Sequence, residues 1–343
     1  MTNNTKMRDA LVFIGRFSPF HNGHKAVIDV ALKQAKEVVV VIGSSFAARN
    51  IRNPFTFEER KAMIESVFNT DRVKVVPVSD FPYDDDKWKI AVRRVVKEAT
   101  PDAKTIGLIG HSKDNTSYYL KIFPDWGSVE VPNVGGINAT DIRNTHLSGF
   151  IVDYSLVPAS TNNFLTHFRT TAEFQVLRTE YEMIKKYKDA WKAAPFPPTF
   201  MTVDAVVVQS GHILLVKRDA MPGRGLWALP GGFLEQDETM LNGAIRELKE
   251  ETKIDLPEKV LLGSVSASKT FDAPNRSSRG RTITQAFKLE LADGPLIKVK
   301  KSRDPNDEVD DAAEAKWFPL NEVKQDQMFE DHHAILDYFC NLQ

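Results

Sequence analysis

Apolar and polar positions follow two different rhythms along the first half of the chain. Short apolar, β-branched runs that favour buried strands occupy 10–14, 38–42, 73–78, 105–109 and 128–131. Stretches with helical spacing lie between the early runs, at 25–36 and 57–68. Strands that alternate with helices predict a parallel sheet covered on both faces. We therefore expect an α/β fold, with ligands bound at the loops that follow the carboxyl ends of the strands.

The middle of the chain carries a long helical pattern and then a proline cluster. Apolar residues at three- and four-residue spacing predict an amphipathic helix over 171–191. The prolines within 195–198 cannot continue a helix and form a stiff spacer. Since 343 residues exceed one usual core, we predict domains over 1–170 and 200–343, joined by a helix and proline-rich linker over 171–199.

The pattern of the last 140 or so residues differs from that of the first half. Two β-rich runs, 203–208 and 212–216, flank Gln209, Ser210 and Gly211, which is a hairpin signal. Further strands are expected at 260–269 and 282–291, and helices at 238–252 and 322–338. This half is therefore a second domain that mixes strands and helices.

Composition excludes several classes of protein. The 45 basic and 46 acidic residues nearly balance, so no overall charge draws the chain to nucleic acid or to an anionic membrane. The longest apolar run, 38–42, is far too short to span a bilayer, and the amino terminus lacks the apolar segment of a secretory signal. Cys340 is the single cysteine, which excludes an internal disulfide and agrees with the cytoplasm. The oligomeric state stays open, with a homo-oligomer among the alternatives.

A motif built for phosphate follows the first predicted strand. It reads Gly15-Arg16-Phe17-Ser18-Pro19-Phe20-His21-Asn22-Gly23-His24. Two histidines flank the start of a predicted helix, whose N–H groups favour anions, and a glycine lets the backbone approach a ligand. A lone histidine is more often structural, but a pair with Gly23 between its members and Arg16 before them indicates a binding site.

This stretch resembles the G-x-F-x-P-x-H-x-G-H signature of the nucleotidyltransferase superfamily, which implies a Rossmann-like domain. Later loops, at 53–60, 110–114 and 137–143, look like those of nicotinamide-mononucleotide (NMN) adenylyltransferases. The last loop is similar to the family's I-S-S-T-x-x-R motif, with Asn138 and Ala139 in place of the two serines. This departure leaves the phosphate contacts to Thr140, Arg143 and backbone amides.

The resemblance implies transfer of the adenylyl group of ATP to NMN, which gives NAD and pyrophosphate. In that reaction His21 and His24 would act on the triphosphate, and Arg16 and Arg143 would bind phosphate oxygens. Thr140 would donate its hydroxyl. The other expected ATP or substrate contacts are Gly15, Phe17, Gly23, Asn53, Trp88, Gly110 and Asp114. Trp88 could stack on the pyridine ring or be an ordinary core aromatic, and the acceptor could be a different phosphate such as phosphopantetheine.

Three glutamates in the second half have the spacing of a metal site. On a helix, Glu247, Glu250 and Glu251 would share one face, because they lie three and four residues apart. A divalent cation would remove their repulsion, and Mg²⁺, which Mn²⁺ can replace, prefers such hard oxygen ligands. The alternative is a solvated acidic face neutralised by Arg246 and Lys249.

The glutamates stand in a longer pattern, G-x₅-E-x₇-R-E-U-x-E-E from Gly232 to Glu251, that resembles the Nudix box. The resemblance implies an α/β/α sandwich with a mixed sheet. The helix of the Nudix box usually ends in glycine, but Lys253 stands here. Lysine would cost about 1 kcal/mol in the left-handed conformation of such a cap, so we expect a changed helix exit.

Nudix resemblance implies metal-assisted cleavage of a nucleoside diphosphate linked to another group. Phe271, Arg279 and Arg281 lie in a segment similar to that of Nudix proteins that act on ADP-ribose, where they would bind substrate; a flexible basic loop is the alternative. The identity of the general base stays open: the acidic stretch 304–314 offers Glu308, Asp310, Asp311 and Glu314, although such a run is by default a solvated loop.

From about residue 9 to the end, the chain resembles bifunctional NMN adenylyltransferase/Nudix proteins. The second reaction would split ADP-ribose into AMP and ribose 5-phosphate. ATP, NMN, NAD and ADP-ribose are thus the expected partners, with neither nucleic acid nor membrane. An alternative is an adenylyltransferase for another phosphate acceptor whose Nudix domain senses ADP-ribose without cleaving it.

Overall fold

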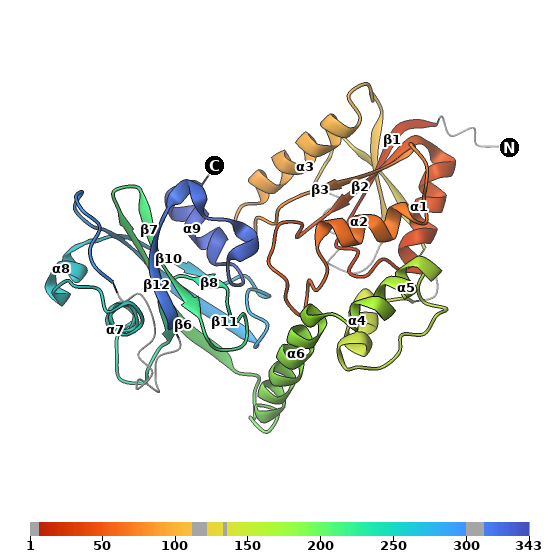
Figure 1. Cartoon of the computed structure of the whole chain (residues 1–343). Helices are drawn as coiled ribbons and strands as arrows, with labels where there is room; N and C mark the ends of the chain where they lie inside the picture. The colour runs from red at the N-terminus through yellow and green to blue at the C-terminus, as the bar shows by residue number, and fades with distance from the viewer. Residues whose placement is uncertain (1–6, 112–121, 133–135, 300–311, 343) are drawn as a thin grey trace. The chain divides into compact units, whose positions relative to one another are not determined.

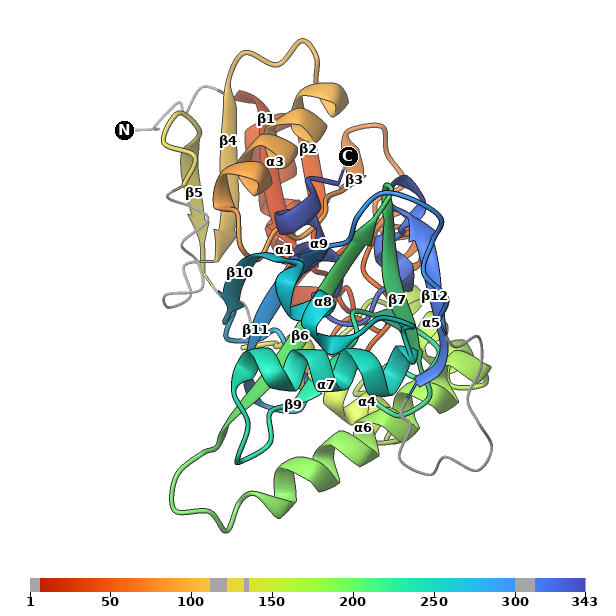
Figure 2. The ribbon, with the colours of Figure 1, turned by 90° about the vertical axis from the view of Figure 1, so that its left-hand side faces the viewer.

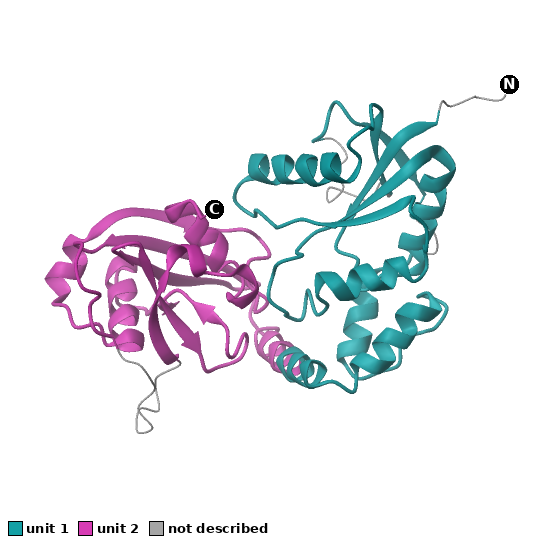
Figure 3. Cartoon of the chain, turned by 45° about the horizontal axis from the view of Figure 1, so that its top comes forward, with its two compact units in different colours: residues 1–181 teal, residues 182–343 magenta. Residues whose placement is uncertain are grey.

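The computed structural model describes residues 7–111, 122–132, 136–299 and 312–342. Its chain divides into two compact units, Met1–Tyr181 and Glu182–Gln343 (Figure 3). The division falls within helix α6 (Ala172–Ala190), which matches the amphipathic pattern at 171–191. The domain limits at 170 and 199 stay predictions. No helix in the described ranges combines the length and the apolar character needed to cross a bilayer.

Unit 1 is built on a five-stranded sheet in which every pair of neighbours is parallel. The strand order is β3-β2-β1-β4-β5; Figure 1 labels β1, β2 and β3, and Figure 2 labels all five strands. The strands are β1 (Arg8–Gly15), β2 (Ala35–Ile42), β3 (Val73–Pro77), β4 (Ile106–His111) and β5 (Gly127–Val131). The order reverses between β1 and β4, and in such sheets ligands bind beside the carboxyl ends at this reversal. The predicted parallel sheet is confirmed.

Helices cover both faces of this sheet because successive strand residues point to opposite sides. In β1, Leu11 and Phe13 belong to one apolar core, and Val12 and Ile14 to the other. Helices α1 (Asn22–Gln34), α2 (Phe57–Glu65), α4 (Ala139–Leu147) and α5 (Ala159–Phe168) supply residues to the first core. Helix α3 (Asp85–Ala99) packs on the second (Figure 2).

Unit 2 contains a mixed, seven-stranded sheet, as predicted, in the order β10-β11-β6-β7-β12 with β8 and β9 attached. Strands β11 and β6 are parallel, and the other pairs are antiparallel. The expected hairpin joins β6 to β7 through Ser210 (φ 46°) and Gly211 (φ 72°). The strands are β6 (Thr199–Gln209), β7 (His212–Arg218), β8 (Trp227–Ala228), β9 (Gly231–Phe233), β10 (Val265–Phe271), β11 (Arg281–Glu290) and β12 (Ala312–Pro319).

The helices of unit 2 differ in part from the sequence prediction. Helix α7 (Met240–Thr252) lies where it was expected. The strand expected from residue 260 is first a short helix, α8 (Glu258–Gly263), because Pro257 occupies its N-cap and pre-sets the backbone for a helix start. The helix expected from residue 322 begins only at α9 (His332–Cys340), because Val323, Lys324 and Met328 have extended backbone and Glu330 has a positive φ of 44°.

A histidine lies deep in the first core of unit 1. His146 on α4 is 1% exposed, and its ring packs among Phe55, Phe168 and Phe174. Its Nε2 has no hydrogen-bond partner among the described residues. Burial, with a smaller contribution from Arg169, lowers the pKa of His146 to about 4. The folded state therefore holds this ring neutral.

This histidine predicts acid sensitivity of unit 1. Above pH 6.5 the ring is neutral both folded and unfolded, so it adds no pH dependence. As the pH falls from 6.5 towards 4, the unfolded chain takes up the proton first, and stability decreases by on the order of 2–3 kcal/mol. The urea unfolding midpoint of wild type should fall between pH 7 and pH 5 more than that of His146→Phe. Equal falls in the two proteins would contradict this prediction.

Candidate active sites

Two histidine rings stack at the start of α1, directly after β1. His21 is the N-cap: its Nδ1 accepts the His24 N–H at 3.3 Å, and His24 Nδ1 accepts the His21 N–H at 3.3 Å. The ring centroids are 3.5 Å apart. Because each Nδ1 accepts a hydrogen bond, the neutral rings carry their protons on Nε2. The structure thus brings the predicted pair together. The Nε2–H group of each ring lies on the side opposite the Nδ1 atom that accepts the backbone hydrogen bond.

Neighbouring residues predicted as nucleotide contacts hold these rings in position. A Cβ on Gly23 would approach the His21 ring to 3.0 Å, so a larger residue there would push this ring out of its position. Phe17 is buried, with φ 50°, and its ring meets the His24 ring edge-on at 4.8 Å. A Cβ on Gly15 would in turn lie 3.1 Å from the Phe17 ring. These three residues therefore support the histidines in the structure.

A buried guanidinium lies near this helix start. Arg143 on α4 donates to the Ser18 carbonyl at 2.8 Å and to Thr140 Oγ1 at 3.3 Å, and its Nε has no partner among the described residues. Burial first, then Arg16 and Arg52, lower its pKa to about 10. Three cations thus lie close enough to repel one another, an arrangement that an anion would stabilise. Sequence reasoning missed Arg52, which has no motif signal.

The start of α4 keeps its cap despite the departure from the family motif. Asn138 is the N-cap, and its side chain accepts the Thr140 N–H at 2.9 Å. Asparagine is among the best N-cap residues, so it replaces a serine in this role. The substitution therefore preserves the helix start that presents Thr140 and Arg143.

Arg60 ties together the loops that follow β1 and β2. It is fully buried, and its guanidinium donates to the carbonyls of Arg16 at 2.9 Å, Gly43 at 2.8 Å and Ser44 at 3.0 Å. Asn53 Nδ2 donates to the same Ser44 carbonyl at 3.0 Å, and Asn53 Oδ1 has no partner among the described residues. Arg60 thus fixes the backbone from which Arg16 projects.

The remaining candidates of unit 1 have different surroundings. Trp88 on α3 is half-buried and packs against Phe123 at 5.9 Å, which favours the core alternative over stacking on a substrate. Gly110 lies near the carboxyl end of β4, opposite Glu130 of β5. Asp114 lies outside the described residues.

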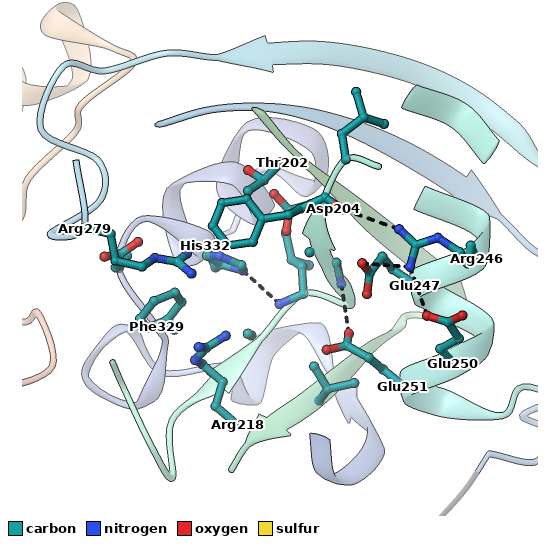
Figure 4. A pocket seen from close by; sticks show the side chains of 18 of the residues that line it. Thr202, Asp204, Arg218, Arg246, Glu247, Glu250, Glu251, Arg279, Phe329 and His332 are labelled. Carbon is teal, nitrogen blue, oxygen red and sulfur yellow. Dashed lines mark hydrogen bonds and ion pairs between the residues drawn. The ribbon is translucent and has the colours of Figure 1, made fainter. Parts of the chain in front are cut away.

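In unit 2, the three glutamates line a cavity of about 640 Å³ (Figure 4). Thr239 caps α7 and accepts the Asn242 N–H, while Ile245 and Leu248 bury the opposite side of the helix in the core. This amphipathic packing turns the carboxylates towards the cavity. A Cβ on Gly232 would lie 2.4 Å from Glu247 Oε1, so glycine gives this carboxylate its room.

The carboxylates are held by donors of the chain itself. Arg246 binds Glu247 at 3.0 Å, Glu250 at 2.9 Å and Glu238 at 2.8 Å. The Gly231 N–H donates to Glu251 Oε2 at 2.9 Å. Within the described ranges, no three His, Cys, Asp or Glu side chains converge closely enough to hold a metal ion by themselves. A cation would therefore share these carboxylates with Arg246.

The electrostatics nevertheless fit a divalent cation. Burial raises the pKa of Glu247, against the opposing effect of Arg246, and raises that of Glu251 well above its usual range. Burial also raises the pKa of Asp204, which lines the same cavity. Carboxylates that lose water in this way need a positive partner to stay ionised. The donor set is all oxygen, which suits Mg²⁺ or Mn²⁺.

Helix α7 ends in the conformation that normally favours glycine. Lys253 has φ 48° and ψ 38°, and its N–H donates to the Lys249 carbonyl at 2.9 Å. The expectation of a changed helix exit is therefore wrong: the left-handed cap is kept, and lysine bears the strain. The cap hydrogen bond and the packing of α7 outweigh a cost of about 1 kcal/mol.

This strained cap predicts a stabilising substitution. Lys253→Gly should raise the free energy of unfolding of unit 2 by about 1 kcal/mol, because glycine adopts this conformation without strain. Lys253→Ala removes the same charge but keeps a Cβ, so it should bring no comparable gain. Denaturant unfolding of the three proteins measures the difference. Equal effects of glycine and alanine would exclude backbone strain as the cause.

The three predicted substrate contacts of unit 2 separate in the structure. Arg279 lines the cavity, with its guanidinium 5.0 Å from the Phe233 ring centre and its Nε without a partner among the described residues. Phe271 is fully buried and packs against Tyr338 and Phe339. Arg281 donates to the Asp272 carbonyl at 2.5 Å and is absent from the cavity lining. The positions of Phe271 and Arg281 favour structural roles.

None of the four acidic residues named as possible general bases is found in the cavity lining among the described residues. Glu308, Asp310 and Asp311 lie outside the described residues. Glu314, on β12 opposite Lys217, is not part of the cavity lining.

Several cavity residues carry no sequence signal. Arg218 lies over the Phe329 ring at 4.1 Å, and His332 Nδ1 accepts the Leu229 N–H at 3.0 Å. Burial lowers the pKa of His332 to about 3. Burial raises the pKa of Glu330, opposed by the Ser278 N–H and Arg279. These residues were missed because they reach the cavity from β7, from the segment before α9 and from the first residue of α9, far from the glutamates in sequence.

Two family models match different parts of the chain. Residues 12–127 match the cytidylyltransferase-like model, and residues 198–339 match the NUDIX domain model. A nicotinamide/nicotinic acid mononucleotide adenylyltransferase from Acinetobacter baylyi is 40% identical over 177 residues, which are 50% of this chain and 93% of that protein. An ADP-ribose pyrophosphatase from Methanocaldococcus jannaschii is 34% identical over 161 residues, which are 47% of this chain and 85% of that protein.

Solved structures that match both units together are among the neighbours. One of them is a bifunctional NMN adenylyltransferase/ADP ribose pyrophosphatase from Francisella tularensis, crystallised with AMP and a manganese ion. Its sequence is 40% identical, the match covers 98% of this chain and 99% of that chain, and the TM-score is 0.91.

Proposed function

Because the chain belongs to the family of bifunctional NMN adenylyltransferase/ADP-ribose pyrophosphatases, we propose that each unit catalyses one of the two reactions through the residues described above. Unit 1 transfers the adenylyl group of ATP to NMN, and unit 2 hydrolyses ADP-ribose to AMP and ribose 5-phosphate. The observation that carries the proposal is that each unit has its own phosphate-binding constellation, one cationic and one built of carboxylates.

In unit 1, the protein's contribution is positioning and charge compensation. The phosphate of NMN attacks the α-phosphorus of ATP, and pyrophosphate leaves, so no covalent intermediate with the protein is needed. His21 and His24 donate hydrogen bonds from their Nε2–H groups to oxygens of the triphosphate. Arg16 and Arg143 bind phosphate oxygens, with the unpartnered Nε of Arg143 as one donor.

In unit 2, Glu247, Glu250 and Glu251 would hold Mg²⁺ or Mn²⁺. When bound, such a cation would polarise phosphoryl oxygens and lower the pKa of a water molecule. Gly231 orients Glu251 through its N–H, and Arg246 limits the repulsion among the glutamates. Arg279 binds the diphosphate from another wall of the cavity.

The alternative of a non-catalytic ADP-ribose sensor is not favoured, because all three carboxylates of the hydrolase motif are present and line the cavity. The cytoplasm stays the proposed compartment, on the evidence of the single cysteine. A homo-oligomer stays a possibility without support.

The test offers the purified protein Mg²⁺ with ATP plus NMN and, separately, Mg²⁺ with ADP-ribose. NAD and pyrophosphate should form in the first mixture, and AMP and ribose 5-phosphate in the second. Absence of either pair of products from folded protein would remove the corresponding half of the proposal. Repeating the second assay with Mn²⁺ tests the choice of metal.

A further inference from the structure

The cavity of unit 2 is lined by a carboxylate, Glu330, that lies near Arg279 and that the proposed chemistry does not use. Arg279 lies across the cavity from Glu247 and Glu250 (Figure 4). Glu330 lines the same cavity and interacts electrostatically with Arg279, so its carboxyl group belongs to this far side. A substrate that places its diphosphate at the glutamates of α7 would extend towards Glu330.

Glu330 is rigidly held. Its Oε1 accepts the Ser278 N–H at 2.9 Å and the Ser278 hydroxyl at 3.3 Å. The next residue, Asp331, makes a two-pronged ion pair with Arg276 at 2.9 Å, and these side chains are only 9% and 4% exposed. The preceding Phe329 N–H donates to the Trp227 carbonyl at 2.8 Å. The carboxyl group of Glu330 is therefore fixed before any substrate arrives.

Its backbone conformation also points to a ligand-binding role. Glu330 has φ 44°, in the left-handed region that residues with a Cβ seldom adopt. Such strain persists where the surrounding structure imposes it, and it often marks binding sites. Within the described part of the chain, Oε2 receives no hydrogen bond, so one oxygen stays available as an acceptor.

We propose that Glu330 binds the vicinal hydroxyl groups of a ribose of the substrate, an inference that rests on the proposed hydrolysis of ADP-ribose. An ionised carboxylate is a pure acceptor, and a ribose diol offers it two donors. Arg279 beside it contacts the adjoining phosphate. Because Glu330 lies across the cavity from the metal-binding glutamates, it determines specificity and does not act as the base.

Kinetics of Glu330→Gln test this role. Glutamine keeps the shape and an oxygen for Ser278, but it turns an amide donor towards the ribose. We expect KM for ADP-ribose to rise about tenfold with kcat nearly unchanged, because a charge-assisted hydrogen bond is lost. A fall in kcat at constant KM would identify a base and overturn the proposal. The matched control is Glu322→Gln, an exposed glutamate outside the cavity lining, whose kinetics should equal wild type.

Product inhibition identifies which ribose is bound. A weaker inhibition of Glu330→Gln by ribose 5-phosphate alone assigns the terminal ribose, and a weaker inhibition by AMP alone assigns the adenosine ribose. Inhibition by pyrophosphate, which has no ribose, should not change. The inference would be overturned if inhibition by both ribose-bearing products were unchanged in Glu330→Gln. It would also be overturned if inhibition by pyrophosphate weakened as much as inhibition by these products. If wild type fails to cleave ADP-ribose, the proposed function itself fails instead.

Discussion

His24→Ala should lower the rate of NAD synthesis about 10²- to 10³-fold and leave ADP-ribose hydrolysis unchanged. The magnitude is that of removing one preorganised donor from a transition state that develops charge on phosphate oxygens. His24 is preorganised by its stacking on His21 at 3.5 Å and by its hydrogen bond to the N-cap. Initial rates with saturating ATP and NMN measure the effect.

Alanine at this position also removes half of a capping box, so stability must be controlled. His24→Gln keeps a side-chain acceptor at the third helical position, which is typical of capping boxes, but lacks the imidazole. It should be as stable as wild type and as inactive as His24→Ala. The exposed His167 on α5 offers a neutral comparison, His167→Ala. NAD synthesis by His24→Gln at the wild-type rate would exclude a catalytic role for the ring.

Glu251→Gln should lower ADP-ribose hydrolysis by about a hundredfold or more, with NAD synthesis intact. Mutation of residues that only orient metal ligands lowers metal affinity or activity about 10- to 100-fold. Loss of a ligand itself should lower activity further. Glu251 is the strongest case among the three glutamates, because its carboxyl group is the most strongly affected by burial. Product formation from ADP-ribose in Mg²⁺ gives the measurement.

The same substitution should not destabilise unit 2. Glutamine can still accept the Gly231 N–H, and it removes a carboxylate that burial disfavours in its ionised form. Loss of activity with equal or higher thermal stability would thus separate a functional carboxylate from a structural one. Glu258→Gln, an exposed partner of Lys249, serves as control. If His24→Ala or Glu251→Gln abolished both activities in folded protein, the two-site model would be wrong.

Local pattern was sufficient wherever a site consists of neighbours on one element. His21 and His24 are joined by a helix start, and Glu247, Glu250 and Glu251 by one helix face, so their spacing alone brings them together. The sheets were predictable for the same reason, since alternation and β-branched runs are local. Helix limits were less predictable: α9 begins at His332 and not at residue 322, because extended residues and the left-handed Glu330 precede it.

The parallel and mixed sheets, and the residues of the two proposed phosphate-binding sites, could be predicted from sequence patterns. Which distant residues lie beside these sites depended on the folding of the whole chain: Arg52 near Arg143, and Arg218 and Glu330 around the cavity of the glutamates. It also decided that Phe271 is buried and that Lys253 adopts a left-handed cap. Periodicity reports the face of one element, whereas burial, ion pairing and backbone strain depend on what the rest of the chain packs against that face.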